Sequence, residues 1–235
     1  MLKLDDWLKR LDYLAENRIT YYDNQHPSNC GEINPDGSIS FDCINMPKSI
    51  INEPDIVYKT KPAGYYVKPG QVIPDVDGMG ILGLCTDVHW FDFSTIVPGE
   101  FLYMRIDGHG GVYRGEIVRN GKIYNVDECT AAWGGGVIHS YMDLKTGARY
   151  AYKGGPQIYA WEAHGKLSKY IDYTKKEKSM FKDIPVTDKN YKIYKWAAET
   201  GLLNIDKDGN FNKEKTIKKK HLAIVLYRFY KLLKK

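Results

Sequence analysis

The chain contains little cysteine and no long apolar segment. Its four cysteines, Cys30, Cys43, Cys85 and Cys129, are widely spaced and form no Cys-x-x-Cys pair, which argues against a zinc knuckle or a redox motif. No segment approaches the ~20 apolar residues that span a bilayer, so we predict no membrane association. The first residues lack the apolar core of a secretory signal peptide. We therefore expect reduced cysteines and a protein held in the cytoplasm of the producing cell, with any action outside that cell following release.

The chain is rich in aromatic residues, and its charge is unevenly distributed. Hydrophobic residues make up 43% of the 235 residues and aromatic residues 13%, which is ample for a packed core. The 19 tyrosines suit shallow polar grooves of the kind that hold carbohydrate or peptide. Residues 179–235 hold 14 Lys and Arg against 6 Asp and Glu, a net charge of +8; the whole chain carries +5, which leaves −3 for residues 1–178. This asymmetry predicts a basic module joined to a mildly acidic one.

Hydrophobic periodicity predicts helices in the first part of the chain. Apolar residues at spacings of three and four favour a helix over residues 4–17. Residues 23–40 are rich in turn-forming residues and predict a loop, after which a helix is expected from about Cys43 to Asn52. Residues 54–98 are Gly- and Pro-rich and predict irregular structure with one short helix at most.

Short β-prone runs follow, and together with the helices they indicate an α+β domain. The Asn120-Gly121 pair predicts a hairpin between two of these runs. The runs cover residues 101–106, 110–115, 122–129 and 136–142. The predicted fold is therefore N-terminal helices packed on a small antiparallel sheet.

A polar, charged segment at residues 174–180 predicts a linker between two domains. We expect a first domain over residues 1–173 and a small all-α module over residues 181–235. The module is predicted to contain helices over about 189–200 and 218–233.

Cys43 stands where a loop is expected to become a helix. A thiol attacks a carbonyl as the thiolate, and a helix N-terminus and a nearby imidazole both favour that form. Free N–H groups at the helix start could hold the oxyanion of a tetrahedral intermediate. His109 would accept and return the proton, and Glu128 would fix the tautomer of the imidazole. The alternative for each residue is structural: a small buried cysteine, a turn histidine beside glycines, and a solvated strand glutamate.

The order of these motifs resembles that of the NlpC-type cysteine peptidases of peptidoglycan, particularly the phage-endolysin branch. In that family Asp-Cys-Ser-Gly starts a helix, His-Val-Gly-Ile-Tyr lies on a strand, and a segment similar to Val-Ile-Glu-Cys-Thr-Pro-Ala-Trp follows. This chain has Asp-Cys-Ile-Asn at 42–45, His-Gly-Gly-Val-Tyr at 109–113 and Val-Asp-Glu-Cys-Thr-Ala-Ala-Trp at 126–133. Over residues from about 8 to 173, the resemblance implies a papain-like domain in which Cys43 is the nucleophile, His109 the base and Glu128 the orienting group.

The same resemblance implies a set of substrate-binding residues. A tyrosine upstream of the cysteine lines the family's substrate groove, and its match here is Tyr22, with Tyr21 as the alternative. Asp42 matches a position that contacts the peptide stem, and Trp133 matches the tryptophan that ends the third motif. The chain departs from the family at residues 44–45, where Ser-Gly is usual, and this puts the substrate preference in question.

No motif predicts a metal or a cofactor. Four histidines are scattered without metal-ligand spacing and are expected to be structural or surface residues: His26, His89, His139 and His164. The run at 206–210 hints at a calcium loop but lacks the twelve-residue pattern with its final glutamate. A turn is predicted there instead.

Residues 181–235 resemble a single S-layer homology repeat. The similar parts are the runs at 181–185, 194–197, 201–202, 209–212 and 222–223. The resemblance implies binding to anionic secondary wall polymers, which the positive charge of the module would favour. The chain departs from the family in having Lys-Lys-Lys-His at 218–221 and one repeat rather than three, so wall binding could require a homo-oligomer. The alternatives are a lysine-coated helical pair that only solubilises, or a nucleic-acid binder, which no recognition motif supports.

These observations predict a phage-type endolysin that acts on Gram-positive peptidoglycan. It would cut an amide through a Cys43 thioester, either the muramoyl–L-alanine amide or a bond of the stem peptide, as an amidase or an endopeptidase. The alternative function is a non-catalytic wall-binding protein that acts through its basic C-terminal module.

Overall fold

The computed structural model of the chain describes residues 1–23, 31–60, 63–174, 182–184, 190–200, 202, 206–211, 225 and 229. The chain divides into two compact units, Met1–Thr174 and Lys175–Lys235. Of the predicted linker at 174–180, all but Thr174 lies outside the described residues. Every predicted catalytic residue lies in the first unit.

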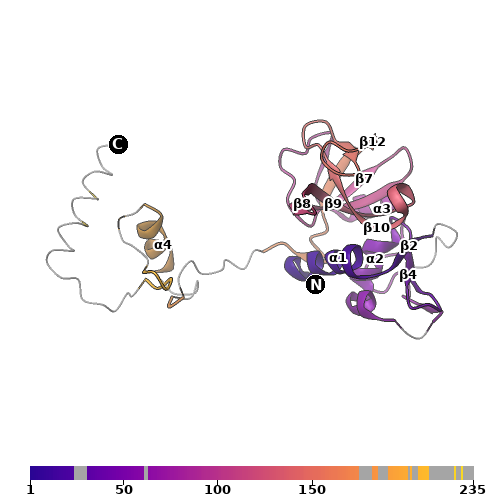
Figure 1. Ribbon diagram of the computed structural model, residues 1–235, viewed down its shortest axis with the longest axis horizontal. Helices are drawn as coiled ribbons and strands as arrows, with labels where there is room; N and C mark the ends of the chain where they lie inside the picture. Colours follow the sequence, from indigo (N-terminus) through magenta and orange to yellow (C-terminus); the bar gives the residue numbers. More distant parts are fainter. Residues whose placement is uncertain are drawn as a thin grey trace. The chain divides into compact units, whose positions relative to one another are not determined.

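The first unit is built around an eight-stranded antiparallel sheet (Figure 1). The strands lie side by side in the order β12-β11-β10-β9-β8-β7-β13-β6, so β12 and β6 form its two edges. Their bounds are β6 Thr86–Trp90, β7 Phe101–Met104, β8 His109–Arg119, β9 Lys122–Thr130, β10 Gly136–Met142, β11 Ala148–Tyr150, β12 Gln157–Ala160 and β13 Ala163–Lys166.

Two smaller sheets accompany the large one. A four-stranded sheet has the order β2-β4-β3-β5, and β1 pairs in parallel with β14. The pairing of β2 with β4 is parallel and sets Tyr22 opposite Phe41, two residues before the predicted nucleophile. The bounds are β1 Leu2–Lys3, β2 Thr20–Tyr22, β3 Glu32–Ile33, β4 Ile39–Phe41, β5 Tyr65–Tyr66 and β14 Ile171–Asp172.

The helices of the first unit follow from apolar periodicity. In α1 (Leu4–Asn17) the buried residues recur at helical spacing, and this helix has the bounds that the sequence predicted: the buried residues are Leu4, Trp7, Leu11 and Leu14. Helix α2 (Asn45–Asn52) begins two residues after Cys43, with Pro47 in its first turn, where proline loses no helical hydrogen bond. The remaining helical segments are α3 Gly78–Leu84 and the 3-10 turns η1 Pro54–Tyr58 and η2 Ala132–Gly134.

Apolar side chains form separate clusters on the first unit. The larger cluster joins α1 and α2 to the sheet through residues such as Trp7, Met46 and Val112. A smaller cluster centres on Trp161, with Leu102 and Tyr113 of neighbouring strands. Because side chains alternate along a strand, the strand residues of the smaller cluster lie on one face of the sheet and those of the larger cluster on the other face. The large sheet is therefore covered on both faces.

The predicted fold class is wrong, because the described residues of the first unit are mostly β. The four predicted strands are present as β7 to β10, but four further strands extend their sheet to eight. It is thus not a small sheet carried by helices in a papain-like arrangement. The added strands have only three to five residues, and β6 is exposed at four of its five positions. Neither the length of an apolar run nor an alternation of apolar and polar residues therefore identified them in the sequence.

The predicted hairpin at Asn120-Gly121 is confirmed. Arg119 pairs with Lys122 across the turn, and both central residues have positive φ, 49° and 73°. A two-residue type I′ turn requires this conformation, which asparagine and glycine adopt most readily. The turn brings β8 and β9 together, and these are the strands that carry His109 and Glu128.

The second unit is described only in part. Helix α4 (Tyr191–Glu199) lies within the first predicted helix of the module, and a small cluster packs Ile184 against Tyr191. The predicted helix over 218–233 lies outside the described residues except at positions 225 and 229. The described residues therefore do not form the all-α module that the sequence predicted. Of the five runs that resemble an S-layer homology repeat, 194–197 is described throughout, 181–185, 201–202 and 209–212 are described in part, and 222–223 lies outside the described residues.

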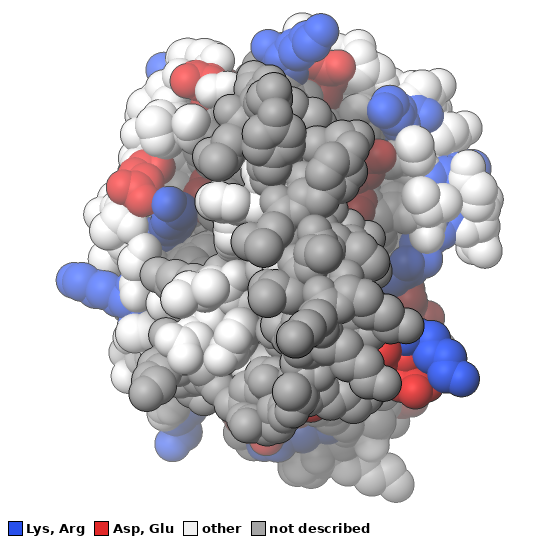
Figure 2. Space-filling model, turned by 90° about the vertical axis from the view of Figure 1, so that its left-hand side faces the viewer, with Lys and Arg blue, Asp and Glu red and all other residues white. Residues whose placement is uncertain are grey.

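Charges of both signs are mixed on the surface of the described residues. On the face drawn in Figure 2, described Lys and Arg residues lie interspersed with described Asp and Glu residues. Within the part of the chain that the structure describes, no helix combines the length and apolar character needed to cross a membrane.

Candidate active site

Asp42 caps the helix that follows Cys43. Its Oδ1 accepts the N–H groups of Ile44 at 2.7 Å and Asn45 at 2.5 Å, and its backbone carbonyl accepts the N–H of Met46 at 3.1 Å. These bonds are of the kind that a helix N-cap makes, and they hold Cys43 in the turn that leads into α2. The N–H of Cys43 comes before those that the Asp42 carboxylate accepts, so it lies at the positive end of the helix dipole.

His109 and Glu128 meet across the β8–β9 hairpin. Val112 pairs with Asp127, and continuing that register sets Gly111 opposite Glu128, with His109 diagonal to Glu128 on the same face. Nε2 of His109 lies 2.6 Å from Oε2 of Glu128. Cys43 lies beside the same ring, close enough for its thiol to raise the pKa of His109 through a hydrogen bond. The structure therefore brings the three predicted catalytic residues together in the expected order.

The electrostatics of this triad favour an ionised histidine. Burial acts to lower the pKa of His109, but the hydrogen bonds to Cys43 and Glu128 outweigh it and raise the pKa to about 9. Burial acts to raise the pKa of Glu128, but its contacts with His109 and Arg149 lower the pKa to about 2. At neutral pH this leaves an imidazolium beside the Glu128 carboxylate and the Cys43 sulfur. Such an imidazolium stabilises a neighbouring thiolate.

Arg149 and Trp161 are parts of the site that the sequence did not reveal. Arg149 donates from Nε to Oε1 of Glu128 at 3.0 Å and from Nη2 to Oε2 at 2.5 Å, a bidentate pair within a fully buried setting. The ring of Trp161 stacks on His109 with centroids 5.4 Å apart. An arginine in a three-residue strand looks the same in sequence whether it is paired or solvated. No local signal distinguished it.

The predicted substrate-binding residues surround the triad to different degrees. The Arg149 guanidinium lies 4.7 Å from the ring centroid of Trp133, which sets this tryptophan beside the Glu128 pair. Burial raises the pKa of the Tyr22 hydroxyl, and the nearby Cys43 and Asp42 raise it further. Tyr21 is about half exposed.

A pocket of about 380 Å³ opens beside the nucleophile. Its wall includes Asp42 and Ile44, the neighbours of Cys43 in the chain, together with residues 75–79 and Tyr103. Buried Lys48 donates to Oδ1 of Asp75 at 2.6 Å and holds one side of this wall in place. The carboxylate of Asp42 lines the pocket while also capping α2. Any contact it makes with a substrate would share its oxygens with the helix.

The other described cysteines differ from Cys43 in their surroundings. Cys129 is fully buried, donates to the carbonyl of Phe41 at 3.3 Å, and has a pKa well above the ordinary value because of its burial. Burial raises the pKa of Cys85 to about 12. All three described cysteines are unpaired; Cys30 lies outside the described residues. Neither Cys85 nor Cys129 has a hydrogen-bonded imidazole like that of Cys43.

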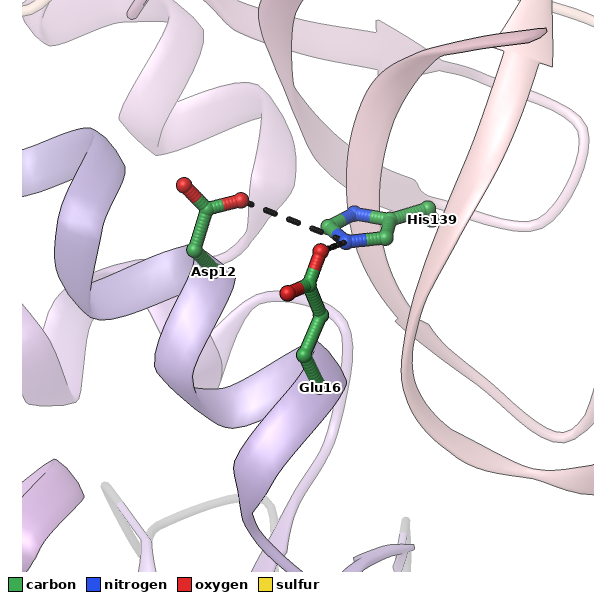
Figure 3. Close-up of side chains that lie close together, drawn as sticks. All are labelled: Asp12, Glu16 and His139. Atoms are coloured by element: carbon green, nitrogen blue, oxygen red, sulfur yellow. Dashed lines mark hydrogen bonds and ion pairs between the residues drawn. The ribbon is translucent and has the colours of Figure 1, made fainter. Parts of the chain in front are cut away.

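A second group of polar side chains, Asp12, Glu16 and His139, has the composition of a metal site (Figure 3). Nε2 of His139 lies 3.1 Å from Oε1 of Glu16 and 4.0 Å from Oδ1 of Asp12. These two oxygens already accept from Arg119 and Arg114 respectively. Two guanidinium groups on the would-be ligand atoms oppose a second cation there. The group is an ion-pair network that ties α1 to the sheet.

The chain was also compared with known proteins. Protein-family models, curated proteins and solved structures yield no match to it.

Proposed function

We propose that the chain is a cysteine amidohydrolase of peptidoglycan. The observation that carries the proposal is the Cys43–His109–Glu128 arrangement, with a pocket lined by Asp42 and Ile44, the chain neighbours of Cys43. A thiol at a helix start, hydrogen-bonded to an imidazole that a buried carboxylate orients, is the arrangement that nucleophilic acyl transfer requires. Peptidoglycan as the substrate is supported by the motif order shared with the NlpC-type peptidases and by the exposed tyrosines.

The reaction would run through a thioester. The Cys43 sulfur attacks the carbonyl carbon of the amide and a C–S bond forms. The resulting oxyanion accepts a hydrogen bond from the backbone N–H of Cys43. His109 gives its proton to the amide nitrogen, the C–N bond breaks and the amine leaves. A water molecule then gives a proton to His109 and attacks the thioester, which releases the acid and restores the thiol pair. Glu128 holds the imidazole orientation throughout.

Mass spectrometry of the products released from purified Gram-positive walls tests this proposal. Wild-type protein is expected to release soluble muropeptides with new amino groups, and their masses identify the bond as the muramoyl amide or a stem-peptide bond. A Cys43→Ala variant is expected to release none. Equal release by the variant, or no release by wild type, would sink the proposal.

The alternative, a wall-binding protein without catalysis, gives the opposite pattern in the same experiment. It would be retained on the walls while neither wild type nor Cys43→Ala releases amino groups. A Cys129→Ala variant serves as the matched control, because it removes a buried thiol that has no imidazole partner. Full release by Cys129→Ala together with none by Cys43→Ala would exclude the non-catalytic reading.

A further inference from the structure

Two exposed aromatic side chains and an arginine lie together at one end of the edge strand β6. Trp90 is 39% exposed and Phe91, the next residue, is 64% exposed. Their ring centroids are 6.1 Å apart, and the Arg105 guanidinium lies 5.4 Å from the first ring and 5.8 Å from the second. We call Trp90, Phe91 and Arg105 the aromatic shelf. Large rings grouped on a surface mark a binding site more often than single exposed apolar residues do.

The shelf is held in place by its surroundings. Glu162 accepts from Nε of Arg105 at 2.5 Å, and the backbone carbonyl of Glu162 accepts the N–H of Phe91 at 2.7 Å. Phe91 has a φ of +57°, a conformation that bulky residues rarely adopt. Strain of this kind persists where the surrounding structure enforces it, often at ligand sites. The rings are thus fixed toward solvent before any ligand arrives.

The shelf continues into the pocket beside Cys43. Ala163 pairs with Trp90 on one side and with Tyr103 on the other, so the three side chains share a row and a face of the sheet. Because alanine is small, the rings of Trp90 and Tyr103 meet edge to face over it, with centroids 6.5 Å apart. Tyr103 lines the pocket that flanks the nucleophile. The contact between Trp90 and Tyr103 therefore connects the shelf to the wall of that pocket.

We propose that the aromatic shelf is a carbohydrate subsite that stacks a sugar ring of the glycan strand carrying the scissile peptide. The inference rests on the proposed function and adds the glycan to the groups that the enzyme recognises. The C–H faces of a pyranose pack on aromatic rings, and the Arg105 N–H groups not used by Glu162 can donate to sugar oxygens.

Charge around the shelf selects among ligands that stack on aromatic rings. Asp77 and Glu162 lie close enough to Tyr103 to raise the pKa of its hydroxyl, an effect that adds to burial. Asp42 and Asp75 line the same pocket. Carboxylates repel the phosphates of a nucleic acid but leave a neutral saccharide unaffected. An uncharged N-acetylated sugar is therefore the ligand that fits.

Binding of the N-acetylglucosamine tetramer, an uncharged probe, tests the shelf on the full chain by calorimetry. Wild type is expected to bind, and Phe91→Ala and Trp90→Ala to bind about tenfold more weakly, since each loses one stacking ring. Phe91→Leu, which keeps apolar volume without a ring, is expected to weaken binding similarly. Tyr159→Ala is the matched control: this tyrosine is 52% exposed with a φ of +50°, on β12 at the opposite edge of the sheet.

Two outcomes would overturn the shelf. In the first, wild type does not bind the tetramer but binds an aromatic dipeptide or a single-stranded oligonucleotide, and Phe91→Ala loses that binding. In the second, wild type and Phe91→Ala digest walls at the same rate, a result that would leave the proposed function standing. Failure of the proposed function would instead appear as wall digestion that Cys43→Ala retains.

Discussion

Glu128 carries a charge in a fully buried position, and the residues around it stabilise that charge. It accepts two hydrogen bonds from Arg149 and one contact from His109. Arg149 keeps the carboxylate ionised, which in turn orients His109 toward Cys43. The arginine is thus a positioning residue that acts through Glu128.

We predict that Arg149→Met lowers the free energy of unfolding by about 3–5 kcal/mol, because it leaves the Glu128 charge buried with one partner fewer. Arg149→Lys keeps the charge but loses the bidentate geometry, so its loss should be smaller. Urea denaturation measures both. Arg119→Met, at a partly exposed arginine paired with Glu16, is the control and should cost at most about 1 kcal/mol. Equal losses at the two arginines would contradict this role.

The raised pKa of His109 makes stability depend on pH in a defined direction. Its contribution is fully present below the unfolded value of 6.5 and is lost as the pH rises through about 9. We expect wild type to lose about 3 kcal/mol of unfolding free energy relative to His109→Gln between pH 6 and pH 10. Denaturation curves of both proteins across this range provide the measurement. Parallel pH profiles would show that His109 gains no such stabilisation.

Among the elements, strand β8 leaves room for Trp161 beside His109 because it has no side chain at Gly111. A Cβ at Gly111 would lie 2.8 Å from a ring carbon of Trp161, the ring that stacks on His109. The glycine leaves the space in which this tryptophan lies against the sheet.

Gly111→Ala is therefore expected to displace Trp161, lower the unfolding free energy by about 1–3 kcal/mol and reduce wall hydrolysis. Gly83→Ala is the matched control, because a Cβ at that position of α3 meets nothing within 4 Å. Thermal unfolding and hydrolysis rates of the two variants are compared side by side. An intact rate in Gly111→Ala would show that Trp161 does not support the site.

Local signals explain which elements the sequence could predict. Helix α1 follows from its apolar spacing, and the β8–β9 turn follows from Asn120-Gly121, because both depend on neighbouring residues alone. Strand β6 could not be found, since it is exposed and pairs only with the distant β13. The candidate nucleophile and its partners were predicted from motif order. Arg149 was not, because its pairing with Glu128 arises only when β9 and its neighbours assemble.

At the scale of the whole molecule, the chain divides into a first unit that holds the candidate site and a second unit of different composition. The first unit holds the large sheet, both larger apolar clusters and the complete candidate site. We predict that residues 1–174 alone fold and cleave soluble muropeptides with the kcat/KM of the full chain, but are retained less on whole walls, because the basic residues 179–235 are absent. Sedimentation with walls and hydrolysis assays measure the two properties. A truncated chain that binds walls as well as the full one would remove the role proposed for the second unit.

Alkylation resolved by residue tests the central claim most directly. Iodoacetamide is added at neutral pH, and peptide mass spectrometry follows Cys43, Cys85 and Cys129 while wall hydrolysis is measured in parallel. The account predicts that Cys43 reacts faster than the other two, that activity falls in step with its modification, and that His109→Gln slows its reaction. Hydrolysis that persists with Cys43 fully modified would contradict it.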